Sequence, residues 1–146
     1  MHLHVEVIDW PISPGPTVPP SLAGPAGALA EFRGLVRNDE GGQPISALEY
    51  EAYSPMAEQT MRRIAREIGG RHGVLSARIV HRVGIVPVGE AAIHLVVAAR
   101  HRGPAFVFLS EFMDRLKQDV PIWKIRALDR TGRPLAAPPV APTPPP

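Results

Sequence analysis

The pattern of hydrophobic and polar positions predicts a chain in which strands alternate with two helices. Near the N-terminus Leu3, Val5 and Val7 alternate with polar residues, which is the period of a half-buried strand. A turn-rich segment at 38–42 and a second turn at 87–90 are expected to join neighbouring strands. The predicted strands are 2–9, 27–37, 45–53, 75–83, 91–99 and 121–128.

Two segments carry the 3.6-residue period of amphipathic helices. The first is expected to use Ser54 as its N-cap and Pro55 as its first helical residue, and to end at the pair Gly69-Gly70. The second is expected to start at Pro104 and to end before Pro121, because the residue before a proline disfavours helical geometry.

From residue 45 onward the predicted order of elements is βαββαβ. The predicted fold class is therefore α+β: a split-βαβ sandwich with an antiparallel or mixed sheet, helices on one face and extra N-terminal strands. Residues 11–25 are rich in proline and predict a loop. We expect one domain over residues 1–133, followed by a Pro-rich, disordered tail over 134–146.

Composition restricts the chemistry that the chain can perform. It contains no cysteine, so disulfides, thiolate metal ligands and cysteine nucleophiles are excluded. If the protein handles sulfur, another molecule must bring it. No run approaches the roughly 20 apolar residues of a membrane span, and residues 1–10 do not resemble a secretory signal. The expected location is the cytoplasm.

The basic residues are unevenly distributed in both position and type. Residues 1–99 contain 8 basic and 10 acidic residues, whereas residues 100–133 contain 8 basic and 4 acidic ones. The basic segment is typical either of a surface for an anionic ligand or of a solvated face. Of the 16 basic residues only Lys117 and Lys124 are lysine. Lysine can exchange a proton in a reaction, whereas arginine keeps its proton.

Candidate groups collect around the second predicted helix. His101-Arg102 precedes it and predicts either an anion site at the helix N-terminus or an ordinary surface loop. Lys117 lies in the last turn, where a cation also complements the helix dipole. The scattered histidines lack the spacing of a metal site, and no Gly-rich nucleotide loop is present. We therefore expect no metal and no cofactor.

Several segments together resemble the large-subunit family of molybdopterin synthase. They are Phe32-Arg33-Gly34-Leu35-Val36-Arg37-Asn38, Leu48-Glu49-Tyr50-Glu51-Ala52-Tyr53 with Met56-Ala57, His81-Arg82-Val83-Gly84, Val88-Gly89-Glu90, His101-Arg102, Ala105-Phe106, Met113, Lys117 and Pro121-Ile122-Trp123-Lys124. Each motif is weak alone, but the ordered set over residues 27–126 is specific.

The resemblance implies a sulfurtransferase that converts a cyclic pyranopterin monophosphate to molybdopterin. In that family the large subunit forms a homodimer at the centre of a heterotetramer. Each copy binds a ubiquitin-like small subunit, whose C-terminal Gly-Gly carries the sulfur as a thiocarboxylate. The expected partners are thus the small subunit, a second copy and the pterin phosphate, with no nucleic acid and no membrane.

The resemblance also assigns roles to residues. Lys117 and Lys124 would be the catalytic pair, while Phe32 and Met113 would form the pocket wall. The expected substrate-binding residues are Leu35, Val36, Arg37, His101, Arg102, Ile125 and Arg126. Trp123-Lys124 is followed here by Ile125-Arg126, whereas the family commonly continues with a lysine and an acid.

Two other functions are compatible with the same residues. The chain could be a non-catalytic module that binds a ubiquitin-like tail or an anionic pterin without turnover. It could also bind nucleic acid through the basic segment 100–133, which would require a continuous exposed stripe and a strong salt dependence. Whether Lys117 and Lys124 face one basic pocket together with Arg37 and His101 distinguishes the sulfurtransferase from the binding module.

Overall fold

The computed structural model describes residues 1–13 and 18–135. Most of the predicted Pro-rich tail, residues 136–146, lies outside the described part. The elements in chain order are β1 (His2–Ile8), η1 (Pro20–Leu22), β2 (Ala28–Leu35), β3 (Asp39–Glu40), β4 (Gln43–Pro44), β5 (Ala47–Ala52), α1 (Met56–His72), β6 (Ser76–Arg82), β7 (Gly84–Pro87), β8 (Ala91–Ala99), α2 (Arg102–Asp119) and β9 (Ile122–Leu128).

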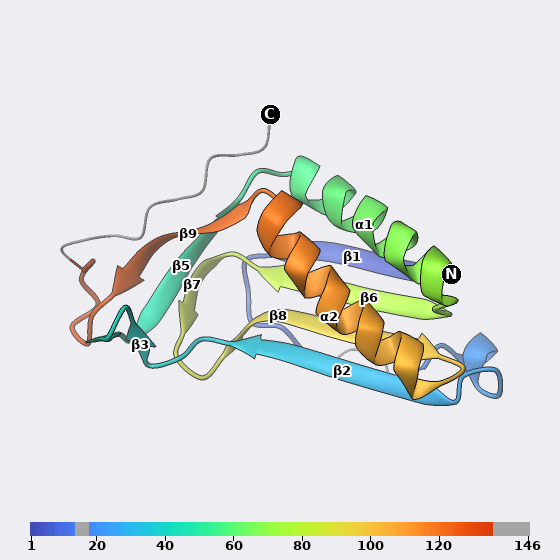
Figure 1. The fold of residues 1–146 in the computed structure, drawn as a ribbon. Coiled ribbons are helices and arrows are strands. Elements are labelled where there is room, and N and C mark those ends of the chain that lie inside the picture. The colour runs from blue at the N-terminus through green and yellow to red at the C-terminus, as the bar shows by residue number, and fades with distance from the viewer. Residues whose placement is uncertain (14–17, 136–146) are drawn as a thin grey trace.

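A four-stranded sheet in the order β1-β6-β8-β2 forms the larger layer of the fold. β1 and β6 run parallel, whereas β6–β8 and β8–β2 are antiparallel. Both helices lie on one face of this sheet (Figure 1). This mixed α+β architecture confirms the predicted fold class.

The main core fills the space between the helices and this sheet. On β8 the alternate residues Ile93, Leu95 and Val97 face the helices, which is the two-residue period of a strand. Phe108 and Phe112, one helical turn apart on α2, are fully buried and stack with ring centroids 5.8 Å apart. The apolar side chains that repeat along the strands and along the helix therefore pack together in one contiguous core.

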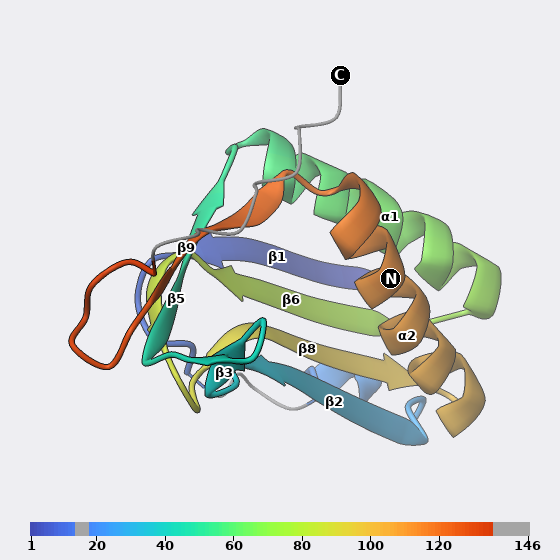
Figure 2. The same cartoon turned by 60° about the vertical axis from the view of Figure 1, so that its left-hand side comes forward.

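The first and last strands of the predicted βαββαβ unit do not join that sheet. β5 instead pairs with β9 on one side and with β7 on the other, giving a second sheet of order β7-β5-β9. This sheet stands at one end of the first, where β2 and β6 end and β8 begins (Figures 1 and 2). Its own small core contains Val36, Leu48 and Val86.

The loop between the paired strands β6 and β8 differs from the prediction. Residues 87–90 join β8 to the extra strand β7, and not directly to β6. Gly84, at a φ of 81°, starts β7 and allows the chain to leave the first sheet and enter the second. The sequence prediction missed β7 because this strand has only four residues.

Three of the predicted helix boundaries need correction. α1 begins at Met56 with Pro55 at the N-cap position, and Ser54 provides no side-chain cap. α1 also continues through Gly69-Gly70 to His72, and Gly73 ends it in the left-handed conformation with a φ of 67°. α2 starts at Arg102, two residues before the predicted start at Pro104.

The position of the α1 C-terminus leads to a prediction with a matched pair of variants. Gly70→Ala adds a methyl group in open space within a helix, so the free energy of unfolding should rise by about 0.5–1 kcal/mol. Gly73→Ala forces alanine into a positive φ and should lower it by about 1 kcal/mol. Urea unfolding measures both. A loss of stability in Gly70→Ala would contradict the extended helix.

Candidate functional site

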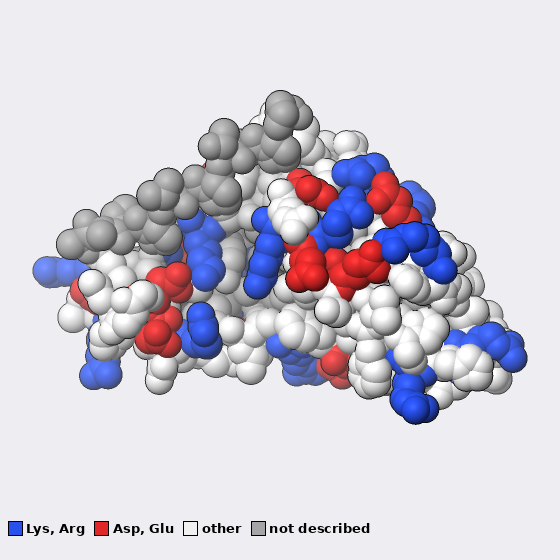
Figure 3. Space-filling view, in the orientation of Figure 1, with Lys and Arg blue, Asp and Glu red and all other residues white. Residues whose placement is uncertain are grey.

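A pocket of about 690 Å³ lies where the two sheets and the end of α2 meet. Basic side chains border a hollow between the second sheet and the helices, whereas acidic and basic side chains intermix over the helices (Figure 3). The residues lining the pocket are Phe32, Gly34, Leu35, Val36, Arg37, Asp39, Glu40, Leu48, Tyr50, His81, Ala92, Ile93, Met113, Leu116, Lys117, Ile122, Trp123 and Lys124.

The two lysines reach this pocket from different elements. Lys117 is exposed in the last turn of α2, while Lys124 lies on β9 after the chain has turned at Pro121. Antiparallel pairing places Lys124 opposite Tyr50 of β5. The chain thus brings its only two lysines to the lining of one pocket.

The electrostatic surroundings of the two lysines differ. Nζ of Lys124 donates to both carboxylate oxygens of Glu40 at 3.5 Å, and its side chain is 37% exposed. Lys117 has no carboxylate within ion-pair distance among the residues that the structure describes. Arg37 lines the same pocket and is exposed, also without an ion-pair partner in the described ranges. The lining therefore contains two cations, Lys117 and Arg37, and one carboxylate, Asp39, without an ion-pair partner among the described residues.

An apolar wall faces these charges. Phe32 on β2 and Met113 on α2 line the pocket together with Leu35 and Val36. Between them Gly34 allows β2 to approach β8 closely, because a Cβ atom there would lie 2.7 Å from Cγ2 of Ile93. Apolar walls with a few polar groups are typical of sites that bind flat organic molecules.

His81 and Tyr50 form the buried polar part of the lining. Their rings meet edge to face with centroids 5.6 Å apart. Burial lowers the pKa of His81 to about 4, so the imidazole is neutral at physiological pH. Burial, together with the charge of Glu40, raises the pKa of Tyr50. Tyr50 and His81 therefore both stay uncharged, whereas the lysine, arginine and carboxylate side chains of the same pocket are charged.

Four predicted site residues do not line this pocket. His101 and Arg102 lie at the N-terminus of α2, and Lys117 is fifteen residues further along, which corresponds to roughly 22 Å of helix. Arg126 forms an ion pair with Glu49 at 2.9 Å, outside the lining. Ile125 occupies the register shift between the pairs Glu49–Arg126 and Tyr50–Lys124, so it has no direct partner on β5.

The prediction of site residues did not include Tyr50, His81, Trp123 and Glu40, although all four line the pocket. The first three stand in the motifs quoted above, but the motifs do not reveal which side chains face a ligand. The pairing of Tyr50 with Lys124 across two strands shows that both side chains lie at the pocket. No local pattern in the sequence predicts this pairing.

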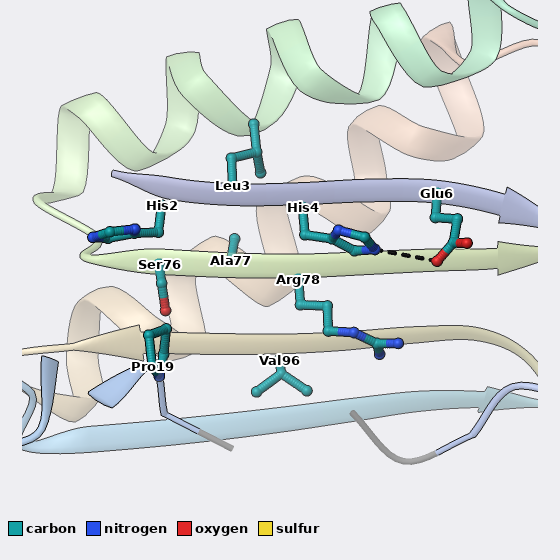
Figure 4. Close-up of a pocket in the computed structure, with 9 residues that line it drawn as sticks. All are labelled: His2, Leu3, His4, Glu6, Pro19, Ser76, Ala77, Arg78 and Val96. Atoms are coloured by element: carbon teal, nitrogen blue, oxygen red, sulfur yellow. Dashed lines mark hydrogen bonds and ion pairs between the residues drawn. The ribbon is translucent and has the colours of Figure 1, made fainter. Parts of the chain in front are cut away.

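A second hollow, of about 520 Å³, lies on the side of the four-stranded sheet away from the helices. His2, His4 and Arg78 border it, and His4 forms a 3.1 Å contact with Glu6, whereas Leu3 points toward the helices (Figure 4). No predicted site residue lines it. Within residues 1–13 and 18–135 no group of His, Cys, Asp and Glu has the arrangement of a metal site.

Comparisons with known proteins identify the family. A family model described as MoaE protein matches residues 11–119. The chain belongs to the MoaE family, the molybdopterin synthase catalytic subunits. No helix of the described part of this MoaE chain is long and apolar enough to span a membrane.

Similar MoaE proteins come from distant organisms. The molybdopterin synthase catalytic subunit of Thermoplasma volcanium is 35% identical over 124 residues, which cover 85% of this chain and 90% of that protein. The human protein of the same name is 43% identical over 98 residues, but the match covers only 52% of it. This MoaE chain thus spans about half the length of the human relative.

Solved MoaE structures share the fold. Molybdopterin synthase from Staphylococcus aureus superposes with a TM-score of 0.77 at 31% identity and covers 90% of this chain and 96% of that one. A complex of subunits 1 and 2 of molybdopterin-converting factor from Helicobacter pylori has a TM-score of 0.66 at 20% identity, which shows a common fold alone.

The burial of His81 predicts how the stability of this MoaE chain depends on pH. An unfolded histidine has a pKa near 6.5, whereas His81 has one of about 4. Between these values the unfolded chain binds the extra proton, so the free energy of unfolding falls as the pH falls. The loss should approach about 3 kcal/mol between pH 6.5 and pH 4 and be absent above pH 7.

The measurement is urea unfolding of wild type and of His81→Asn across pH 4 to 8. Subtracting the two curves removes the contributions of the other titrating groups. The difference in stability between the proteins should shrink as the pH is lowered. A difference that is constant over the whole range would show that His81 titrates normally.

Proposed function

We propose that this chain is the catalytic subunit of a molybdopterin synthase. It would convert cyclic pyranopterin monophosphate to molybdopterin with sulfur from the thiocarboxylated C-terminus of a ubiquitin-like small subunit. The observation that supports this proposal most strongly is the convergence of Lys117 and Lys124, from α2 and β9, on one pocket that also contains Arg37. The family membership and the absence of cysteine support it independently.

The surroundings of Lys117 suit the role of the catalytic residue that lies beside the thiocarboxylate. It is exposed, so the end of a partner's tail can reach its ammonium group from solvent. No carboxylate of the described residues neutralises it, and a free ammonium stabilises negative charge that develops as sulfur is transferred. It also has a proton to give or take back at the reacting atoms.

Lys124 and Arg37 fit the role of holding the pterin phosphate. Lys124 is partly buried and already oriented by Glu40, which fixes its ammonium group on the β9 side of the pocket. Arg37 offers a planar guanidinium with several donors, a geometry that matches phosphate oxygens. Leu35, Val36, Phe32 and Met113 would then contact the apolar parts of the substrate.

His101 and Arg102 can bind the same phosphate only if they come from a second copy of the chain. Within one chain they lie roughly 22 Å along α2 from Lys117. We propose that the chain forms a homodimer that places the N-terminus of α2 at the mouth of its partner's pocket. With two small subunits bound, this dimer would be the centre of a heterotetramer located in the cytoplasm.

A non-catalytic binding module is the second candidate function. Its supporting observation is the ion pair between Lys124 and Glu40, which reduces the free positive charge of the pocket. Such a module would bind the pterin or the small subunit with normal affinity but would make no product.

The first test is molybdopterin formation from the cyclic pterin and the thiocarboxylated small subunit. Lys117→Ala should lower the rate by at least about a hundredfold, because a positioned proton-transfer group is worth roughly 10²–10⁴. Lys117→Arg should restore part of the binding but little of the rate, since arginine keeps its proton.

Arg66→Ala is the matched control, because Arg66 is an exposed cation on α1 that does not line the pocket. It should leave the rate unchanged. A folded wild type that binds both ligands and forms no product would favour the binding module over the enzyme.

The homodimer can be tested by complementation between two inactive variants. Arg102→Ala and Lys117→Ala should each be impaired alone. A mixed dimer contains one copy of each variant, and one of its two sites would have both Arg102 and Lys117 intact. Random pairing makes about half of the dimers mixed, so co-expression should recover about a quarter of the wild-type sites. Activity that stays at the level of the single variants would show that Arg102 does not serve a partner's pocket.

A further inference from the structure

His81 presents a hydrogen-bond acceptor that the fold itself does not use. Its Nδ1 lies 2.9 Å from the backbone oxygen of Arg82. A carbonyl oxygen can only accept, so Nδ1 must carry the proton of the neutral ring and Nε2 must carry the lone pair. No hydrogen bond to Nε2 exists among residues 1–13 and 18–135.

This acceptor can be reached only from the pocket that contains the two lysines. His81 is 5% exposed and lines the lysine pocket, so its remaining contact with solvent is through that pocket. Because Arg82 fixes one side of the ring and Tyr50 packs against it, the imidazole cannot turn away to find a partner elsewhere.

The acceptor is close to the proposed reaction site. Tyr50 contacts His81 through its ring and is the cross-strand partner of Lys124. Side chains at paired positions of antiparallel strands lie on the same side of the sheet. Lys124, Tyr50 and His81 therefore form a row along the wall of one pocket.

We propose that Nε2 of His81 accepts a hydrogen bond from an N–H group of the pterin ring and so positions the substrate for sulfur transfer. This inference rests on the proposed function. Lys117 is exposed whereas His81 is buried, so a tail that enters from solvent meets Lys117 before it can reach His81. The flat heterocycle, which has N–H donors at its edge, then occupies the deeper part of the pocket beside Tyr50.

His81 is thus a positioning residue that also discriminates among ligands. A neutral acceptor fixed in a buried wall favours rings with a donor at the matching position and disfavours analogues with an acceptor there. The neighbouring cations cannot provide this selection, because a lysine or an arginine only donates hydrogen bonds.

Two variants separate the acceptor from the structural hydrogen bond. His81→Asn keeps an N–H donor near the position of Nδ1 and removes the acceptor at Nε2. His81→Gln can place an amide oxygen near the position of Nε2. If the acceptor binds the pterin, His81→Asn should raise the KM for the pterin about tenfold with a smaller change in kcat, and His81→Gln should recover part of the loss. Circular dichroism of both variants checks that they fold.

The second readout is the ¹⁵N resonance of Nε2 in the full chain labelled with ¹⁵N-histidine, identified by its absence in His81→Asn. Addition of the cyclic pterin should shift this resonance in the direction of an accepted hydrogen bond. Addition of the small subunit alone, in its unreactive carboxylate form, should leave it in place. A shift caused by the small subunit and not by the pterin would overturn the proposal.

The remaining outcomes separate this inference from the proposed function. A wild type that makes molybdopterin, with a resonance unmoved by pterin and a folded His81→Asn of normal KM, would refute the acceptor role and leave the function standing. A wild type that makes no product but shows the pterin-dependent shift would refute the enzymatic function and keep the acceptor role.

Discussion

The antiparallel pairing of β5 with β9 is the interaction on which the arrangement of the site depends. The chain leaves α2 after Lys117, turns at Pro121 and returns along β5, where Lys124 lies opposite Tyr50. Without this pairing the two lysines would be separated by a helix end and a proline, with nothing to direct both toward one pocket. The apolar cluster beneath β5 and β9, which contains Leu48 and Ala127, stabilises the pairing.

The two sheets contribute differently to the core and to the pocket. The four-stranded sheet and its helices contain the larger core, including Phe108 and Phe112. The second sheet contributes Tyr50 and Lys124 at its junction with β2 and α2. Ile93 and Leu116 belong to the main core and also line the pocket, so the apolar wall of the site is the edge of that core.

The sequence predicts the periodic elements well and the long-range pairings poorly. Helix α2 is recognisable because Phe108, Phe112 and Leu116 repeat at helical spacing, and its end is fixed by Pro121. The glycine pair in α1 misleads, because Gly70 is helical and the left-handed conformation is taken by Gly73 instead. The strand β7 is too short for its alternation to be recognised. β7 becomes recognisable only through its pairing with β5, which the local pattern does not contain.

The same limit applies to the site. The motifs that contain Lys117, Lys124, Arg37, Phe32 and Met113 predict residues that do line one pocket. They also predict His101 and Arg102, which are at the far end of α2, because a motif records which residues belong to a family and not where the fold places them. The contact between His81 and Tyr50 depends on how β5 packs against β6 across the junction of the sheets, and this packing is specified by the whole fold.

The contact between Lys124 and Glu40 sets how much positive charge the pocket offers to an anion. The carboxylate of Glu40 lies 3.5 Å from Nζ of Lys124 through both of its oxygens. An anion that enters the pocket therefore shares this ammonium group with a carboxylate of the same chain, whereas Lys117 and Arg37 have no such ion pair in the described residues. Glu40 belongs to the two-residue strand β3, which pairs only with β4. The side chain that tempers the charge of Lys124 thus stands on a small hairpin that is separate from both larger sheets.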